Sequence, residues 1–248
     1  MIRRAISIAL RCCGLDRRSR RFRREYAGFK ALSANDSRFA LNWDERAPYM
    51  DDATATTGYD WHYVLHPGWA ARVLEQTRPA AHVDISSSLF FIATVSAFMP
   101  IRYYDYRPAK LPLEGVVSAS ADLMHLPFRD EELPSISCMH VIEHIGLGRY
   151  GDPLDATGDL KAARELARVV ARNGQLLIVA PVGRPTIRFN AHRIYSYAQV
   201  LEMFSGLQLR EFALIPDDVK EPELIRDAPP ERVERQTYAC GCFWFEKR

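Results

Sequence analysis

Short apolar segments alternate with helical patterns between residues 82 and 180, and this alternation constrains the fold more than any other feature. The candidate strands are 82–85, 102–106, 116–121, 136–141 and 175–180. Helical patterns over 89–98 and 159–170 lie between members of this series, and the second carries apolar residues at helical spacing. Strands separated by helices are typical of a doubly wound α/β fold, a mostly parallel sheet with helices on both faces. We therefore expect an α/β protein of this class.

Further elements flank this series. We expect a helix over 68–78, another over 197–204, and two final strands over 207–215 and 238–246. Asn173 and Gly174 are expected to end the 159–170 helix, because glycine favours the left-handed conformation of a helix stop. The segment 216–235 is rich in proline and charge, so we expect it to be irregular. Residues 61–66 (WHYVLH) either cover the ligand site or pack against the sheet.

The N-terminal region differs from the rest in charge. Residues 1–30 carry nine arginines and one lysine against two acidic residues, whereas the other 218 residues carry 23 basic and 29 acidic ones. We therefore expect a basic N-terminal arm and irregular extension over 1–60, with at most one short helix before Lys30, and an α/β domain over 61–248. The arm is either a solvated tail or a peripheral contact with an anionic membrane, where each base adds roughly 1 kcal/mol. Cys12 and Cys13 are candidate lipidation sites.

Composition excludes several classes of protein. The chain is 48% hydrophobic and 26% charged, as in ordinary globular proteins, and no apolar run approaches the ~20 residues that span a bilayer. Five cysteines without regular spacing argue against a disulfide scaffold and favour a reducing, cytoplasmic compartment. The acidic body lacks aromatic residues alternating with basic ones, so we expect no nucleic-acid partner.

Polar residues follow four of the predicted strands. In a doubly wound fold the ligand crevice lies beyond the carboxyl ends of the strands, so these residues are candidates for one site. The first strand ends in an acidic residue and a serine turn, the second in an acidic residue, and the third and fourth run into polar loops. The candidates are Asp84, Ser86, Ser87, Asp105, Asp122, Leu123, His140, Glu143 and His144.

These motifs carry a family resemblance. The order strand–Asp, strand–Asp, Asp-x-x-x-Leu-Pro-Phe and a strand ending in His-x-x-Glu-His resembles the class I S-adenosylmethionine-dependent methyltransferases over about residues 80–215, and weakly to 246. The chain is also similar to a bacterial methyltransferase-like family of uncharacterised function, through 146–153 (GLGRYGDP) and 189–196 (FNAHRIYS). The resemblance implies a Rossmann-like sheet of seven strands, the last ones antiparallel, with S-adenosylmethionine as cofactor.

The resemblance also implies roles for single residues. Asp84 would lie by the methionine end of the cofactor, Asp105 would bind the ribose, and Asp122 and Leu123 would lie by the adenine. His140 would lie beside the sulfonium and the acceptor. One departure concerns the turn after the first strand, where the family has glycines and this chain has Ser86–Ser88. Glycine there permits a positive φ and close approach of the cofactor, so serines make the fit tighter.

Two further loops are candidates for binding the acceptor. The glycine-rich segment 146–153 carries Arg149 and Tyr150, and is either a flexible loop or a lid over the substrate. Hydrogen-bonding side chains also follow the fifth strand, on the expected ligand side. They are Asn190, His192, Arg193 and Tyr195. The planar guanidinium of Arg193 suits a carboxylate or a phosphate.

Three functions follow, from different classes. The first is a methyltransferase acting on a small polar acceptor such as a sugar or another metabolite, in which His140, Glu143 or His144 takes the proton. The second is a binding or scaffold protein with a degenerate cofactor site. The third is a metal-dependent hydrolase, because His140–His144 spells an inverted zinc-protease motif. That motif needs both histidines on one helix, and His140 ends a predicted strand, so we expect no metal site.

Overall fold

The computed structural model describes residues 17–248. The chain folds as two compact units that meet after Tyr59 in the sequence, and the second unit comprises Asp60–Arg248. Cys12 and Cys13, the candidate lipidation sites, lie outside the described residues. Among the helices of the described part, none combines the length and the apolar character needed to cross a bilayer.

The first unit contains α2 (Arg17–Leu32) and the 3-10 helix η1 (Trp43–Glu45). α2 is strongly basic and buries no side chain, and it is longer than the short helix that the sequence predicts. Tyr26 meets the ring of Trp43 edge-on, with the centroids 4.8 Å apart, and the guanidinium of Arg46 lies 4.4 Å from the same ring centroid. Such aromatic and cation–π contacts contribute about 0.5–1 kcal/mol each, and the Tyr26–Trp43 contact joins α2 to η1.

The second unit is built on an eight-stranded sheet of order β3-β2-β1-β4-β5-β10-β8-β9. Its strands are β1 (His82–Ile85), β2 (Ile101–Asp105), β3 (Val116–Ser120), β4 (Leu133–Met139), β5 (Val170–Val182), β8 (Gln208–Ile215), β9 (Ile225–Arg226) and β10 (Ala239–Glu246). β1 to β5 pair in parallel, whereas β10 lies antiparallel between β5 and β8. The predicted fold class is confirmed, and the short β9 makes eight strands where seven were expected.

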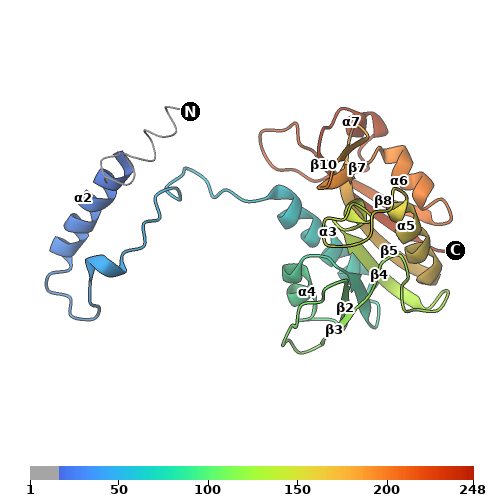
Figure 1. Ribbon diagram of the computed structural model, residues 1–248, viewed down its shortest axis with the longest axis horizontal. Helices are drawn as coiled ribbons and strands as arrows, with labels where there is room; N and C mark the ends of the chain where they lie inside the picture. The colour runs from blue at the N-terminus through green and yellow to red at the C-terminus, as the bar shows by residue number, and fades with distance from the viewer. Residues whose placement is uncertain (1–16) are drawn as a thin grey trace. The chain divides into compact units, whose positions relative to one another are not determined.

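Helices cover both faces of this sheet (Figure 1). α3 (Trp61–Thr77) and α4 (Leu89–Val95) pack on one face, and α5 (Gly158–Val169) and α6 (Tyr197–Met203) pack on the other. Side chains alternate between the two cores along β5. Leu177 and Val179 pack with α3 and α4, while Leu176 and Ile178 pack with α5 and α6. The alternation follows from the two-residue period of a strand and leaves β5 buried on both sides.

Several predicted boundaries differ from the structure: β4 and β5 begin three and five residues early, and α4 ends at Val95 rather than at residue 98. Two further differences have a clear local cause. α3 begins at Trp61 rather than at Gly68, because the carboxylate of Asp60 accepts the Tyr63 N–H at 3.2 Å and caps the helix. Pro67 therefore lies inside the helix instead of before it. Asn173 and Gly174 do not end α5, which already stops at Val169. They lie within β5, where Asn173 has a left-handed φ of 59° and donates its N–H to the Lys247 carbonyl at 2.7 Å.

Several short elements give no clear signal in the sequence. β6 (Thr186–Arg188) and β7 (His192–Ile194) form an antiparallel hairpin after β5. The proline- and charge-rich segment 216–235 contains β9 and α7 (Pro230–Glu234), so it is not wholly irregular. Proline at the start of α7 suits the first turn of a helix, where its missing N–H would be unpaired in any case.

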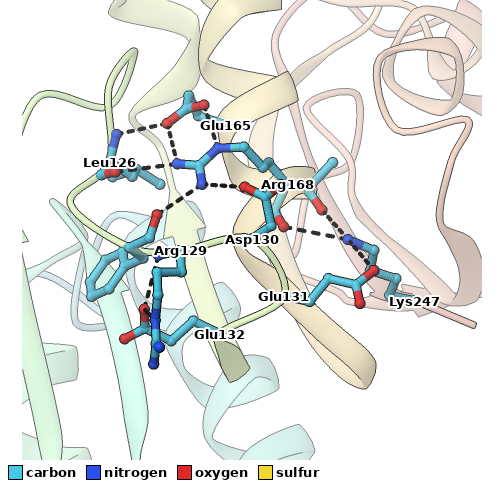
Figure 2. Close-up of polar contacts among 10 residues, drawn as sticks. Leu126, Arg129, Asp130, Glu131, Glu132, Glu165, Arg168 and Lys247 are labelled. Carbon is cyan, nitrogen blue, oxygen red and sulfur yellow. Dashed lines mark hydrogen bonds and ion pairs between the residues drawn. The ribbon is translucent and has the colours of Figure 1, made fainter.

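An ion-pair network fixes the segment between β3 and β4 to α5 (Figure 2). The guanidinium of Arg168 donates to both carboxylate oxygens of Glu165 at 2.7 Å and to Asp130 at 2.9 Å. It also donates to the carbonyls of Phe128 and Leu126, at 2.8 and 3.3 Å. The carboxylate of Glu165 in turn accepts the Leu126 N–H at 2.8 Å. The network thus holds the end of the loop that begins with Asp122 and Leu123.

Candidate active site

The first strand ends in a tight turn that Asp84 supports. Asp84 is fully buried, and its Oδ1 accepts the Ser87 backbone N–H at 3.0 Å. Ser86 has a φ of 57°, in the left-handed region that glycine favours, and donates its N–H to the Tyr104 carbonyl at 2.7 Å. The Ser87 hydroxyl accepts the Met139 N–H at 3.1 Å, which ties the turn to the end of β4. Ser86 therefore takes the backbone conformation that favours glycine, and Ser87 fastens the turn.

A chain of buried polar groups leads from Asp84 into the sheet. Ser137 donates to Asp84, and His82 lies between Ser137 and Ser135, with its ring nitrogens 2.8 and 2.7 Å from their hydroxyls. Because the Ser137 proton points to Asp84, Nε2 of His82 donates to Ser137, and Nδ1 accepts from Ser135. Burial lowers the pKa of His82 to about 3 and raises the pKa of Asp84 to about 6, against the hydrogen bonds that Asp84 accepts.

Asp105, Asp122 and Leu123 line a common cavity of about 200 Å³ beyond the ends of β1, β2 and β3. The carboxylate of Asp105 accepts the Arg107 N–H at 2.7 Å and the Tyr103 hydroxyl at 3.0 Å. A carboxylate has about four acceptor positions, so Asp105 retains capacity for a ligand's hydroxyls. Asp122 also caps a turn, because its Oδ1 accepts the Met124 N–H at 2.8 Å. Ser86 and His140 lie on the wall of the same cavity.

The His-x-x-Glu-His segment forms the turn from β4 into the 3-10 helix η2 (Ile142–His144). His140 has a left-handed φ of 57°, and its Nδ1 lies 3.0 Å from Oε1 of Glu143. Nδ1 of His144 lies 2.6 Å from the carbonyl oxygen of Ala191. Both rings therefore donate from Nδ1 and present Nε2 as an acceptor. Burial lowers the pKa of His144, against the nearby carboxylate of Glu143, so the ring is neutral at pH 7.

A second cavity of about 380 Å³ adjoins the first. Both are lined by Ser86, His140, His144 and Tyr150, so they are two parts of one hollow, which we call the strand-end cleft. Arg149 and His192 also line the second cavity. The Arg149 guanidinium donates to the Ala191 carbonyl at 2.9 Å and holds the 146–153 loop against the residue before β7. Arg149, Tyr150 and His192 therefore lie at the cleft, as a site for an acceptor requires.

Asn190 and Arg193 do not line the strand-end cleft. Asn190 is exposed in the tight connection between β6 and β7. Arg193 is 5% exposed and donates to the Ile145 carbonyl at 2.7 Å, and it pairs with Asp159 at 3.5 Å. Its planar fork thus binds the protein's own carbonyl and carboxylate groups and joins β7 to the start of α5. Tyr195 is likewise buried, and its hydroxyl donates to Asp159 at 3.1 Å.

Two tyrosines complete the lining of the second cavity. Tyr63, on α3, belongs to the 61–66 segment expected either to cover the ligand site or to pack on the sheet, whereas Tyr238, just before β10, was not among the predicted site residues. The rings of His62, Tyr63 and His66 all lie against the ring of His140, with centroids 5.9, 5.2 and 5.0 Å away. The 61–66 segment therefore both packs on the sheet and borders the cleft. In the sequence, the dense run of aromatic residues and histidines after Asp60 is the feature that marks this segment as part of the site.

Comparison with known proteins gives a partial match by sequence. Residues 129–222 match a family model described as "Caenorhabditis protein of unknown function, DUF268". The match runs from the loop before β4 to the segment after β8 and includes His140, Glu143 and His144. No functionally curated protein sequence matches the chain.

Solved structures resemble a larger part of the chain. The YcgJ protein of Bacillus subtilis has 16% identity and a TM-score of 0.52, covering 74% of this chain and 98% of that one. A chain from the complex of the Haloferax volcanii Trm112 methyltransferase activator with "the putative methyltransferase" has 16% identity and a TM-score of 0.52, covering 75% and 90%. A "putative sarcosine dimethylglycine methyltransferase" from Galdieria sulphuraria has 14% identity and a TM-score of 0.52, covering 73% and 84%. The chain therefore has the fold of the class I S-adenosylmethionine-dependent methyltransferases.

Proposed function

We propose that the chain is an S-adenosylmethionine-dependent methyltransferase that acts on a small polar acceptor. The observation that carries the proposal is the strand-end cleft. It gathers Asp105, Asp122 and Leu123 from separate strand ends on the wall of one cavity and places His144 where this cavity meets the next. A doubly wound sheet places its ligand at this edge, so fold and side chains support the same site.

The residues of the cleft fit the proposed cofactor. The carboxylate of Asp105 suits the two ribose hydroxyls, and Leu123 with Val141 supplies an apolar wall for the adenine. Ser86 takes the left-handed conformation that the methionine end requires, but its Cβ narrows the approach to the backbone. When bound, the cofactor supplies an electrophilic methyl group on a sulfonium. The chain's own contribution is to hold the two reactants in line, and alignment alone supplies much of such a rate.

On the acceptor side, His144 is the residue that we assign to proton transfer. The hydrogen bond from its Nδ1 to the Ala191 carbonyl fixes the tautomer, so Nε2 carries the lone pair that would act as the base, with the Arg149 guanidinium 3.5 Å away. His140 is held by Glu143 instead and acts as a wall of the cleft. Arg149, Tyr150 and His192 surround the second cavity with polar groups, which favours a small polar acceptor such as a sugar.

Binding of labelled S-adenosylhomocysteine tests the proposed site. We expect Asp105→Ala to weaken binding about 10- to 100-fold, because a hydrogen bond to a charged group contributes roughly 1.5–3 kcal/mol. The matched control is Glu114→Ala, which removes an exposed carboxylate from the β2–β3 connection, outside the cleft, and should leave the affinity unchanged. Equal binding by the Asp105 variant and the wild type would place the ligand elsewhere.

A scaffold protein with a degenerate cofactor site is the alternative, and the serine turn is the observation that favours it. The same experiment separates the two functions. A scaffold would bind neither S-adenosylmethionine nor S-adenosylhomocysteine, in the wild type or in a Ser86→Gly variant that restores glycine to the turn. Binding that appears only in Ser86→Gly would show that the serine side chain blocks an otherwise complete site.

A further inference from the structure

Among the described residues, three buried imidazole nitrogens have no hydrogen-bond partner, and they are Nε2 of His66, His140 and His192. The rings of His66 and His140 lie in contact with each other at the strand-end cleft. The His140 side chain is 3% exposed, and His66 is fully buried. Nearly all buried polar groups in proteins are paired, so two unpaired nitrogens on rings only 5.0 Å apart call for an explanation.

The bonds made by the opposite ring nitrogens decide what these two atoms can accept. Nδ1 of His140 faces the Glu143 carboxylate at 3.0 Å, and Nδ1 of His66 faces the His62 carbonyl at 2.5 Å. Both partners are acceptors, so each Nδ1 carries the proton and each Nε2 presents a lone pair. A lone pair is satisfied by a hydrogen-bond donor or by a metal ion. The described residues place no donor against either nitrogen.

A thiol completes the cluster. Ligand atoms of His62, His140 and Cys240 all lie within 4.8 Å of one another. Cys240 is a free cysteine, fully buried on β10. Zinc bonds of about 2.0–2.3 Å to nitrogen and sulfur place ligand atoms somewhat closer than this, so small side-chain rotations close the set around an ion. The three ligands come from α3, from the end of β4 and from β10.

We propose that His62, His140 and Cys240 bind a zinc-class divalent ion through two imidazoles and a thiolate. Imidazole with thiolate is a donor set that zinc favours over magnesium or calcium. The carboxylate of Glu143 orients His140, as outer carboxylates commonly orient the histidines of zinc sites. His66 lies beside these ligands, with its ring centroid 5.0 Å from that of His140. The site shares His140 with the wall of the strand-end cleft, but neither its ligand geometry nor its test depends on the cofactor.

This site differs from the zinc-protease motif that the sequence spells. That motif would bind the ion between His140 and His144, with Glu143 activating a water molecule. Here His144 binds the Ala191 carbonyl through Nδ1, and Glu143 is hydrogen-bonded to a ligand. The ion would instead fasten α3 to two strands of the sheet. Its ligands lie 78 and 100 residues apart along the chain, so spacing in the sequence gives no indication of the site.

Metal content and cobalt spectroscopy of the full chain, with any purification tag removed, test the proposal. All variants carry Cys12→Ala and Cys13→Ala, so that these thiols cannot bind the ion. We expect about one Zn²⁺ per chain, and an ultraviolet thiolate charge-transfer band when Co²⁺ replaces it. Cys240→Ser and His62→Asn should each lose at least about 10- to 100-fold in Zn²⁺ affinity, measured against a chromophoric chelator.

The matched control is Cys138→Ala, which removes a fully buried thiol that packs in the opposite core. It should keep both the Zn²⁺ affinity and the charge-transfer band. Failure of the unsubstituted ligand set to bind Zn²⁺, or a band that is lost in Cys138→Ala, would overturn the proposal. If Cys240→Ser or His62→Asn fails to give folded protein, the cobalt charge-transfer band still tests the proposal, because it must be present in the chain with the intact ligand set and must persist in Cys138→Ala.

Discussion

Ser86 and His140 face the same cleft and share an unusual backbone conformation, with φ of 57° at each. For a residue with a Cβ this conformation costs about 1–2 kcal/mol. The surrounding hydrogen bonds compensate, because Ser86 is held by the Tyr104 carbonyl and His140 donates its N–H to the Val179 carbonyl at 2.8 Å. Strain held in place by neighbouring contacts is common where a chain must present groups to a ligand.

The cost at Ser86 can be measured. We expect Ser86→Gly to raise the free energy of unfolding by up to about 1 kcal/mol, because relief of strain exceeds the added entropy of the unfolded chain. The control is Ser88→Gly, two residues along, where φ is −59° and no strain exists. It should lower the free energy of unfolding by about 0.5–1 kcal/mol. Urea unfolding measures both, and equal losses in the two variants would show that the turn is unstrained.

His82 makes stability depend on pH. Its pKa of about 3 in the folded state lies below the ordinary value of 6.5, so between these values the unfolded state binds more protons. The free energy of unfolding should therefore fall as the pH drops below 6.5. Asp84, with a pKa raised to about 6 from 3.8, acts in the opposite sense between those values and offsets part of the loss.

His82→Gln isolates this term. Glutamine keeps an amide donor and a carbonyl acceptor but does not titrate, so the variant should be less stable at pH 7 and lose less stability on acidification. The difference between variant and wild type should shrink steadily from pH 6.5 downward in urea unfolding. A constant difference across that range would mean that His82 is not the buried neutral group described above.

At the scale of elements, the loop from β3 to β4 depends on α5 for its position. This loop begins with Asp122 and Leu123 in the cleft and ends in the ion-pair network of Arg168 (Figure 2). The Arg168 side chain is 31% exposed and bonds to four different residues. Its neighbours hold its pKa above the ordinary arginine value, Glu165 most strongly and Asp130 next.

Removal of the Arg168 side chain should therefore matter more than removal of a neighbouring arginine. We expect Arg168→Ala to lower the free energy of unfolding by about 1–3 kcal/mol, because Glu165 is left without its partner and two loop carbonyls lose donors. Arg164→Ala, on an exposed face of the same helix, should change it by less than about 0.5 kcal/mol. Thermal and urea unfolding compare the two, and equal effects would show that the network contributes no stability.

Local patterns predicted the elements whose signal lies within a few residues. β1 follows the predicted range residue for residue, and α5 differs by one residue at each end, because apolar periodicity alone defines them. The predicted start of α3 was wrong because Pro67 and Gly68 are residues that often mark a helix boundary. The residue that caps the helix, Asp60, lies more than one helical turn before them. β9 and the β6–β7 hairpin are two- and three-residue strands that depend on pairing with other segments.

At the scale of the whole molecule, the order of the sheet brings distant residues to one edge. Asp105, Asp122, His140 and His144 were predicted as site residues because strand ends are visible in the sequence, and all four line the cleft. Tyr238 and Cys240 were not predicted as site residues. They reach the site because β10 inserts between β5 and β8, and the local sequence of β10 does not indicate which strands it pairs with. Arg193 was predicted for the cleft because its guanidinium suits an anionic ligand. In the structure the guanidinium instead binds the Ile145 carbonyl and the Asp159 carboxylate, and so joins β7 to α5.

The central claim is that the strand-end cleft binds S-adenosylmethionine. The most direct measurement is calorimetric titration of the full chain with this compound and with S-adenosylhomocysteine. Our account predicts one site per chain with a dissociation constant in the micromolar range, about −8 kcal/mol of binding free energy. An absence of binding up to millimolar concentrations, both in the wild type and in Ser86→Gly, would contradict it and leave the methyltransferase fold without its cofactor.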